Sequence, residues 1–91
     1  MTFIIQYHRD VAEKDIPLLS QEWRDTVKRV IEGKLTTHPE VFGKPLHSSL
    51  RGYRKLRVGD YRVIFCIENN LVKIFAIQHR SVVYKNIERR I

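Results

Sequence analysis

The sequence predicts an α+β fold, and two contrasting patterns along the chain indicate it. The first half holds a β-branched, apolar run followed by two segments of helical periodicity, whereas the second half holds three β-rich runs separated by turn residues. Runs joined by tight turns pair as antiparallel strands, and amphipathic helices cover a sheet face. We therefore expect an antiparallel sheet of about four strands, an N-terminal helical hairpin packed on one face and a short C-terminal helix.

The length of the chain indicates a single domain at residues 1–91, since chains this small form one core. Hydrophobic residues make up 43% of the sequence and charged residues 30%, which is the balance of a soluble globular domain.

The N-terminal segment Thr2–Tyr7 has the composition of a strand. Residues 3–5 are apolar without interruption, so we expect this strand to be buried on both faces. Asp10 and Glu13 have capping-box spacing, which predicts a helix from Asp10 to about Leu19. The inner face of this helix would carry Ala12, Ile16 and Leu19.

A second helix is predicted to follow at once, with Ser20 as its N-cap. Apolar residues recur along one stripe of it, at Trp23, Val27, Val30 and Ile31. Charged residues are expected to face away from the core, namely Arg24, Asp25, Lys28 and Arg29. Gly33 should end the helical pattern.

The second half of the chain reads as a three-stranded meander. Its strands are expected at Tyr53–Val58, Tyr61–Ile67 and Leu71–Gln78, with turns at Gly59-Asp60 and Asn69-Asn70. The tail Ser81–Ile91 has helical composition, and we expect a short helix that is weakly held at the edge of the sheet.

The first hairpin of the meander predicts a basic face. If Gly59 and Asp60 form the turn, Arg57 lies opposite Arg62, and Lys55 shares their face. The opposite face would enter the core with Leu56, Val58, Tyr61, Val63 and Phe65. Like charges opposite each other destabilise a sheet, so an anion between the two arginines would explain the pair. A solvated polar face is the alternative interpretation.

The overall charge agrees with a polyanion as partner. Seventeen Lys and Arg against ten Asp and Glu give a formal net charge of +7. Such a field attracts nucleic acid, an anionic membrane or an acidic protein, although a merely soluble surface is also compatible with it. His79 and Arg80 end the last predicted strand and Tyr84 follows, which adds groups of the kind that bind single-stranded RNA through phosphates and stacked bases.

Other site types find no support in the sequence. Cys66 is the single cysteine, so no intrachain disulfide can form, and this suits a reducing cytosol. No signal peptide or membrane-spanning run is recognisable, and we expect a cytoplasmic protein. His8, His38 and His47 lack metal-ligand spacing, so we expect no metal ion and no cofactor.

The stretch from Leu50 to Phe65, LRGYRKLRVGDYRVIF, resembles the central signature of RelE/ParE toxins. The order of strand, helical hairpin and meander is also similar to that family, as are His79-Arg80 and Val83-Tyr84 near the end of the chain. The resemblance covers nearly the whole sequence and implies a RelE/ParE-like fold.

Three functions remain open from this resemblance, because a shared fold does not decide between them. A RelE-like chain would be the toxin of a type II toxin-antitoxin system that cleaves messenger RNA on the ribosome without metal and inhibits translation. A ParE-like chain would inhibit DNA gyrase and have no nuclease activity. A third alternative is a non-catalytic module that only binds an antitoxin. The partners implied are a cognate antitoxin, in a hetero-oligomer, and the ribosome with its messenger RNA, but no membrane.

The resemblance also assigns roles to individual residues. Lys55 and Arg62 match basic residues of the RelE active face, Arg80 a C-terminal arginine, and Tyr84 a tyrosine that stacks on substrate. In the implied attack of a ribose 2′-hydroxyl on the adjacent phosphate, Arg62 would stabilise the developing charge and Lys55 would assist deprotonation or orient the phosphate. Arg80 or His79 would serve the leaving oxygen, and histidine is the better proton donor of the two.

Further contacts to RNA are expected from Tyr53, Arg54 and Arg57. Tyr53 departs from the family pattern, because some RelE proteins have a second lysine there. No glutamate matches the acid and base pair of other relatives, so the general base stays open.

Overall fold

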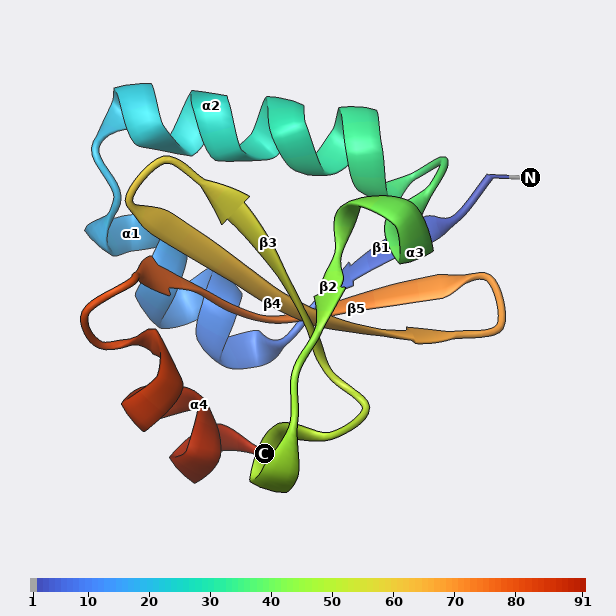
Figure 1. Ribbon diagram of the computed structural model, residues 1–91. Coiled ribbons are helices and arrows are strands. Elements are labelled where there is room, and N and C mark those ends of the chain that lie inside the picture. The colour runs from blue at the N-terminus through green and yellow to red at the C-terminus, as the bar shows by residue number, and fades with distance from the viewer. Residues whose placement is uncertain (1) are drawn as a thin grey trace.

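The computed structural model describes residues 2–91 (Figure 1). Its helices are α1 (Ile16–Leu18), α2 (Gln21–Val30), α3 (Pro39–Phe42) and α4 (Val83–Arg90), with wide helical turns η1 (Val11–Asp15) and η2 (Ile31–Leu35) and a 3₁₀ turn η3 (Ser48–Leu50). Its strands are β1 (Ile4–Tyr7), β2 (Lys44–Pro45), β3 (Arg54–Val58), β4 (Tyr61–Glu68) and β5 (Leu71–His79).

The strands form one five-stranded sheet in the order β1-β5-β4-β3-β2. The predicted α+β class and the β3–β4–β5 meander are confirmed. The sheet has one strand more than expected, the two-residue β2, and β1 pairs with β5 in parallel while all other pairs are antiparallel. The expected burial of β1 on both faces is wrong, because β1 is an edge strand and Ile4 is 56% exposed.

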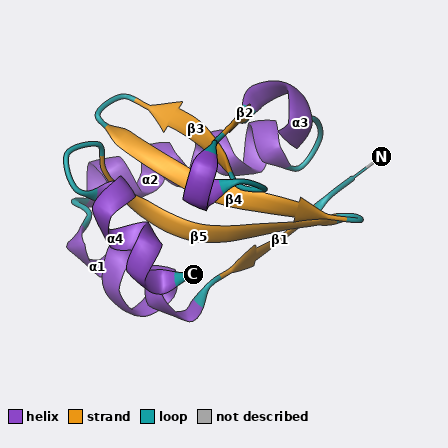
Figure 2. Ribbon diagram, turned by 60° about the horizontal axis from the view of Figure 1, so that its bottom comes forward, coloured by secondary structure: helices purple, strands orange, loops and turns teal. Residues whose placement is uncertain are grey.

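The helices lie on opposite faces of the sheet. Val27 and Ile31 pack from α2 and η2 on one face, while Val83 and Ile87 of α4 are fully buried against the other. Figure 2 shows α4 in the foreground near the left end of β5, with α2 behind the sheet. The predicted C-terminal helix is therefore present, but the expectation that it is weakly held is wrong, since a second apolar cluster covers it.

The first helical segment differs from the expected capping box. Arg9 and Asp10 are already helical, and the Asp10 side chain makes no cap hydrogen bond. The buried positions are Val11, Asp15 and Leu19, whereas Ala12 is exposed. The buried face of this helical segment is therefore not the predicted one. The segment lies along the edge of β5, and its buried side includes the Asp15 carboxylate, which binds that strand.

The second helix begins as predicted, with the Ser20 hydroxyl accepting from the backbone N–H of Trp23 over 3.3 Å. It does not end at Gly33, because helical winding continues to Leu35, which is fully buried. Arg24 does not face away from the core as expected, since its Nη2 donates to the backbone oxygen of Leu19 over 3.0 Å.

The β3–β4 turn packs closely against the indole ring of Trp23. Gly59 has φ +59°, and a Cβ placed there would lie 2.6 Å from Trp23 Cη2. The indole cannot easily retreat, because its ring also packs on Tyr61 with centroids 4.7 Å apart. Glycine is thus required here for conformation and for space.

We predict that Gly59→Ala and Gly33→Ala have opposite effects on stability. Gly59→Ala should lower the free energy of unfolding by about 1–3 kcal/mol, because alanine is strained at positive φ and meets the indole. Gly33→Ala should raise it by about 0.5–1 kcal/mol, because Gly33 is helical with nothing within 4 Å of the added methyl. Urea titration followed by circular dichroism measures both. Equal effects of the two substitutions would contradict the tight contact at the turn.

Candidate nucleic-acid interface

The basic face predicted from the hairpin is present. Lys55 pairs with Ile64 and Arg57 with Arg62 across β3 and β4, so these partners project from one side of the sheet. The alternate residues of both strands enter the core under α2, as expected. We call Lys55, Arg57 and Arg62 the basic face. It is less open than predicted, because Ile64 is buried under α4, Lys55 and Arg62 are half-buried and Arg57 alone of the three cations is exposed.

Helix α4 brings an aromatic ring to this face. Lys55 Nζ lies 6.0 Å from the ring centroid of Tyr84, within the range of a cation–π contact. Residues 29 positions apart in the sequence are thus neighbours, and the site combines cations with a ring that could stack on a base.

Arg62 is anchored to the hairpin turn. Its Nη1 donates to the backbone oxygens of Gly59 over 2.8 Å and of Tyr61 over 2.9 Å. Within residues 2–91 these bonds occupy Nη1 alone, and a guanidinium has five N–H groups. The N–H groups of Nε and Nη2 are therefore available to an anion, while the backbone holds the position of the charge.

Arg80 lies beside the same turn. Its backbone N–H donates to the oxygen of Asp60 over 2.8 Å, and its Nε is 3.9 Å from Asp60 Oδ1. Both side chains are exposed, so the ion pair contributes little to stability and can be exchanged for a ligand. The backbone bond, in contrast, fixes the point at which Arg80 leaves the sheet.

His79 lies on the opposite side of the sheet from the basic face. It pairs with Tyr61, and the two rings meet edge to face with centroids 5.8 Å apart on the side that carries Trp23. Its Nδ1 lies 2.8 Å from Ser81 Oγ and accepts from the backbone N–H of Ser81 over 3.2 Å, which ties the ring to the turn after β5. The structure therefore separates His79 from Lys55 and Arg62.

Two further residues expected to contact RNA also make internal contacts. Arg54 Nη1 donates to the backbone oxygens of Gly43 over 2.9 Å and of Glu40 over 3.3 Å, so it braces the α3–β2 corner on the other side of β3 from Lys55. Tyr53 packs edge to face on Phe75 with centroids 5.2 Å apart, and burial raises the pKa of its phenol. Tyr53 thus supports the cluster under α4.

The sequence interpretation missed Gln78 and Asn86. Gln78 is the cross-strand neighbour of Arg62, and its Oε1 accepts from Asn86 Nδ2 over 2.9 Å. Strand alternation could have placed Gln78 on the basic face, since it is two residues from Ala76 on that side. No sequence pattern marks Asn86.

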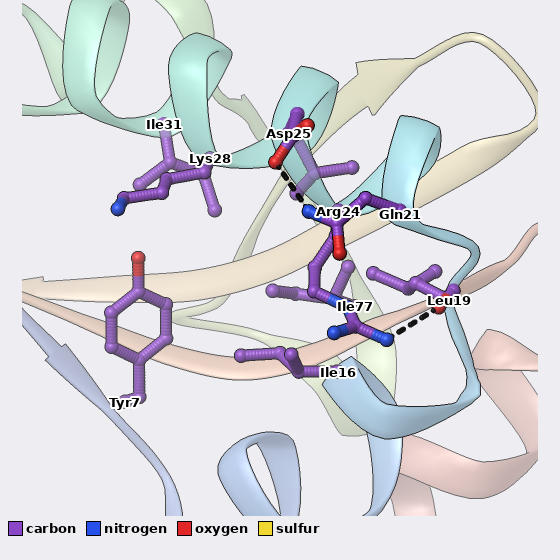
Figure 3. Close-up of a pocket in the computed structure, with 10 residues that line it drawn as sticks. Tyr7, Ile16, Leu19, Gln21, Arg24, Asp25, Lys28, Ile31 and Ile77 are labelled. Atoms are coloured by element: carbon purple, nitrogen blue, oxygen red, sulfur yellow. Dashed lines mark hydrogen bonds between the residues drawn. The ribbon is translucent and has the colours of Figure 1, made fainter.

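A cavity of about 370 Å³ opens between α1, α2 and the sheet (Figure 3). Apolar side chains line much of it, with a guanidinium at the centre. Arg24 Nε is buried there, and no atom of residues 2–91 makes a hydrogen bond with it. The residues around it are Tyr7, Ile16, Leu19, Gln21, Arg24, Asp25, Val27, Lys28, Ile31 and Ile77.

Two negative findings apply to residues 2–91. No group of three or more His, Cys, Asp or Glu side chains is placed to hold a metal ion. No helix among these residues has the length and apolarity to cross a membrane.

Comparison with known proteins identifies the family. The model for the ParE toxin of the type II toxin-antitoxin system parDE matches residues 6–84. The chain belongs to the RelE/ParE toxin family. Toxin RelE of Mycobacterium tuberculosis (strain ATCC 25618 / H37Rv) is 33% identical over 76 residues, which cover 81% of this chain and 78% of the relative. This RelE-like chain is therefore a toxin of a toxin-antitoxin system, and the resemblance seen in its sequence is confirmed.

Solved structures support the same family for this RelE-like toxin. The toxin-antitoxin complex RelBE2 from M. tuberculosis matches with a TM-score of 0.81 and 26% identity, over 89% of this chain and 94% of the other. YafQ from E. coli matches with a TM-score of 0.58 and 18% identity, over 90% and 98% of the two chains. The YoeB-YefM complex from Staphylococcus aureus matches with a TM-score of 0.59 and 18% identity, over 88% and 99%. The last two likenesses concern the fold alone.

We predict that the basic face of this RelE-like toxin dominates the salt dependence of RNA binding. Lys55→Gln with Arg57→Gln should reduce the slope of log affinity against log salt by about 1.4 for single-stranded RNA, at about 0.7 per phosphate contact. The control pair Lys28→Gln with Arg29→Gln, exposed on α2, lowers the formal charge equally and should leave the slope nearly unchanged. Fluorescence anisotropy at several salt concentrations measures the slopes. Equal losses would mean that diffuse charge, not this face, binds RNA.

Proposed function

We propose that this RelE-like toxin is a ribosome-dependent endoribonuclease that cleaves messenger RNA without metal and thereby inhibits translation in the cytoplasm. The observation that supports this proposal is the gathering of Lys55, Arg57 and Arg62 on one sheet face, with the ring of Tyr84 next to Lys55. Cations bind the phosphates of single-stranded RNA, and an aromatic ring stacks on its bases.

The reaction forms a bond from the ribose 2′-oxygen to phosphorus, as the 2′-hydroxyl gives its proton to water, and breaks the bond from phosphorus to the 5′-oxygen. It leaves a cyclic phosphate and a 5′-hydroxyl, so negative charge grows on the phosphoryl oxygens. Arg62 stabilises that charge through Nε and Nη2, because its Nη1 is held by the turn. Lys55 orients the phosphate by its positive charge, next to the ring of Tyr84.

Arg80 is the residue that serves the leaving 5′-oxygen in this proposal. It lies beside the turn that anchors Arg62 and stabilises the oxygen by charge, while water supplies the proton. His79 has no part in the proposed site, in contrast to the expectation from the sequence, because it lies on the other side of the sheet with Tyr61.

The alternative function is inhibition of DNA gyrase without nuclease activity. The description of the matching family model, a ParE toxin, favours it. Binding to gyrase makes no demand for cations placed against a phosphoryl transition state, so a substitution on the basic face distinguishes the two functions.

We predict that Arg62→Ala slows cleavage of ribosome-bound messenger RNA by about 10²–10³-fold, because one donor to the transition state is lost. Thermal unfolding and antitoxin affinity should change little. Arg29→Ala, an exposed arginine on α2, is the control and should cleave like the wild type. If the wild-type toxin cuts no message on ribosomes and blocks gyrase supercoiling, the ParE-like function replaces the one proposed here.

We also propose that a cognate antitoxin neutralises this toxin in a hetero-oligomeric complex and occupies the cavity beside α2. The structural relative RelBE2 is a toxin-antitoxin complex. An acidic, amphipathic segment fits the cavity, because its apolar side chains would cover Ile16 and Ile77 while a carboxylate would pair with Arg24 Nε.

We predict that Arg24→Met weakens antitoxin binding by about 10-fold or more, because a hydrogen-bonded charge pair is lost while an apolar stem of similar size is kept. Arg29→Met removes the same group from the outer side of α2 and should leave the affinity unchanged. Isothermal titration of the purified toxin with its antitoxin measures both. Unchanged binding of the Arg24 variant would place the antitoxin elsewhere.

A further inference from the structure

A buried carboxylate joins the first helical segment to the C-terminal helix. The Asp15 side chain is 1% exposed, and Arg90 donates to it from Nη1 over 2.7 Å and from Nη2 over 3.1 Å. A guanidinium that makes two parallel bonds to a carboxylate fixes direction as well as distance. Arg90 Nη1 also donates to the backbone oxygen of Phe75 over 2.9 Å. The last turn of α4 is therefore held in one place on β5.

A second connection reaches α4 through the same carboxylate. Gln78 Nε2 donates to Asp15 Oδ1 over 2.9 Å, and Asn86 Nδ2 on α4 donates to Gln78 Oε1 over 2.9 Å. Asn86 and Arg90 are four residues apart, so both face the same way on the helix. The buried stripe of Val83 and Ile87 sets which side of α4 faces the sheet, and the two polar connections fix that orientation from one flank of the helix.

The rotation of α4 decides where Tyr84 lies. Tyr84 is two residues before Asn86, and its ring is next to Lys55 on the basic face. We propose that Asp15 and Arg90 are positioning residues for RNA cleavage, which act through α4 to hold Tyr84 beside Lys55. Neither residue contacts the RNA. The inference rests on the proposed function in so far as Tyr84 stacks on a base of the message.

The position of Tyr84 can be tested without activity. Arg90→Lys keeps the charge and loses the planar fork, whereas the control Arg89→Lys changes an exposed neighbour. With 3-fluorotyrosine at the four tyrosines, Tyr84→Phe assigns the resonance of interest. Arg90→Lys should shift or broaden the Tyr84 fluorine resonance and leave those of Tyr7 and Tyr61 in place. An unchanged Tyr84 resonance would overturn the proposal.

Cleavage supplies the second measurement. In single-turnover reactions on ribosomes, Arg90→Lys should slow cleavage by about 10-fold while ribosome affinity stays the same, because only the geometry of the ring changes. In a Tyr84→Ala background, Arg90→Lys should cause no further loss of cleavage rate, since both changes remove the same contribution, the correctly placed Tyr84 ring. Additive losses would show that Arg90 acts through stability and would overturn the proposal.

Two controls keep the test decisive. Asn86→Ala leaves the Asp15–Arg90 pair intact and breaks only the bond to Gln78, so it should shift the Tyr84 resonance in the same direction by a smaller amount. If circular dichroism shows that Arg90→Lys does not fold, Asn86→Ala is used to test the proposal in its place. If the wild-type toxin cuts no RNA, the proposed function fails, while the fluorine spectra still show whether Arg90 positions Tyr84.

Discussion

The buried carboxylate of Asp15 is the constraint on which the arrangement of the helices depends. A carboxylate out of water costs several kcal/mol unless hydrogen bonds replace its hydration. Asp15 receives them from the backbone N–H of Ile77, from Gln78 and from both terminal nitrogens of Arg90. The hydrogen bond to Asp15 in turn raises the pKa of Arg90, so the guanidinium stays charged. Three segments distant in sequence must therefore meet at one point.

That point lies where β5 has no neighbouring strand on its β1 side, although β4 still pairs with its other side. β1 pairs with β5 only as far as Tyr7 and Ile74, so the N–H of Ile77 beyond it needs another acceptor. The helical turn η1 supplies one through Asp15, which explains why a charged residue occupies a buried position of this helical segment. The same contact lets α2 and α4 cover opposite faces, because η1 and the Arg90 end of α4 meet at the edge between them.

Sequence reasoning succeeded where interactions are local and failed where they are distant. The pairing of Arg57 with Arg62 follows from a two-residue turn and a period of two, and both are visible in adjacent residues. The contact between Asp15 and Arg90 spans 75 positions, and nothing near either residue indicates it. His79 shows a second limit. It ends a strand whose alternation places it with Tyr61, yet the chain order alone suggested that it follows the cations to their face.

Arg62 and Tyr84, the cation and the aromatic ring of the candidate site, are held in place by different kinds of contact, and this difference affects function. Backbone oxygens of a tight turn hold Arg62, whereas helix contacts hold Tyr84. The position of Arg62 is thus set within one hairpin, whereas the position of Tyr84 depends on contacts of α4 with β5 and η1. Charge, which attracts RNA over a distance, is held by local bonds, and the ring, which must meet one base, is held by contacts between segments far apart in the chain. In a nuclease of this design, binding strength and cleavage rate can vary separately, because one depends on the hairpin and the other on α4.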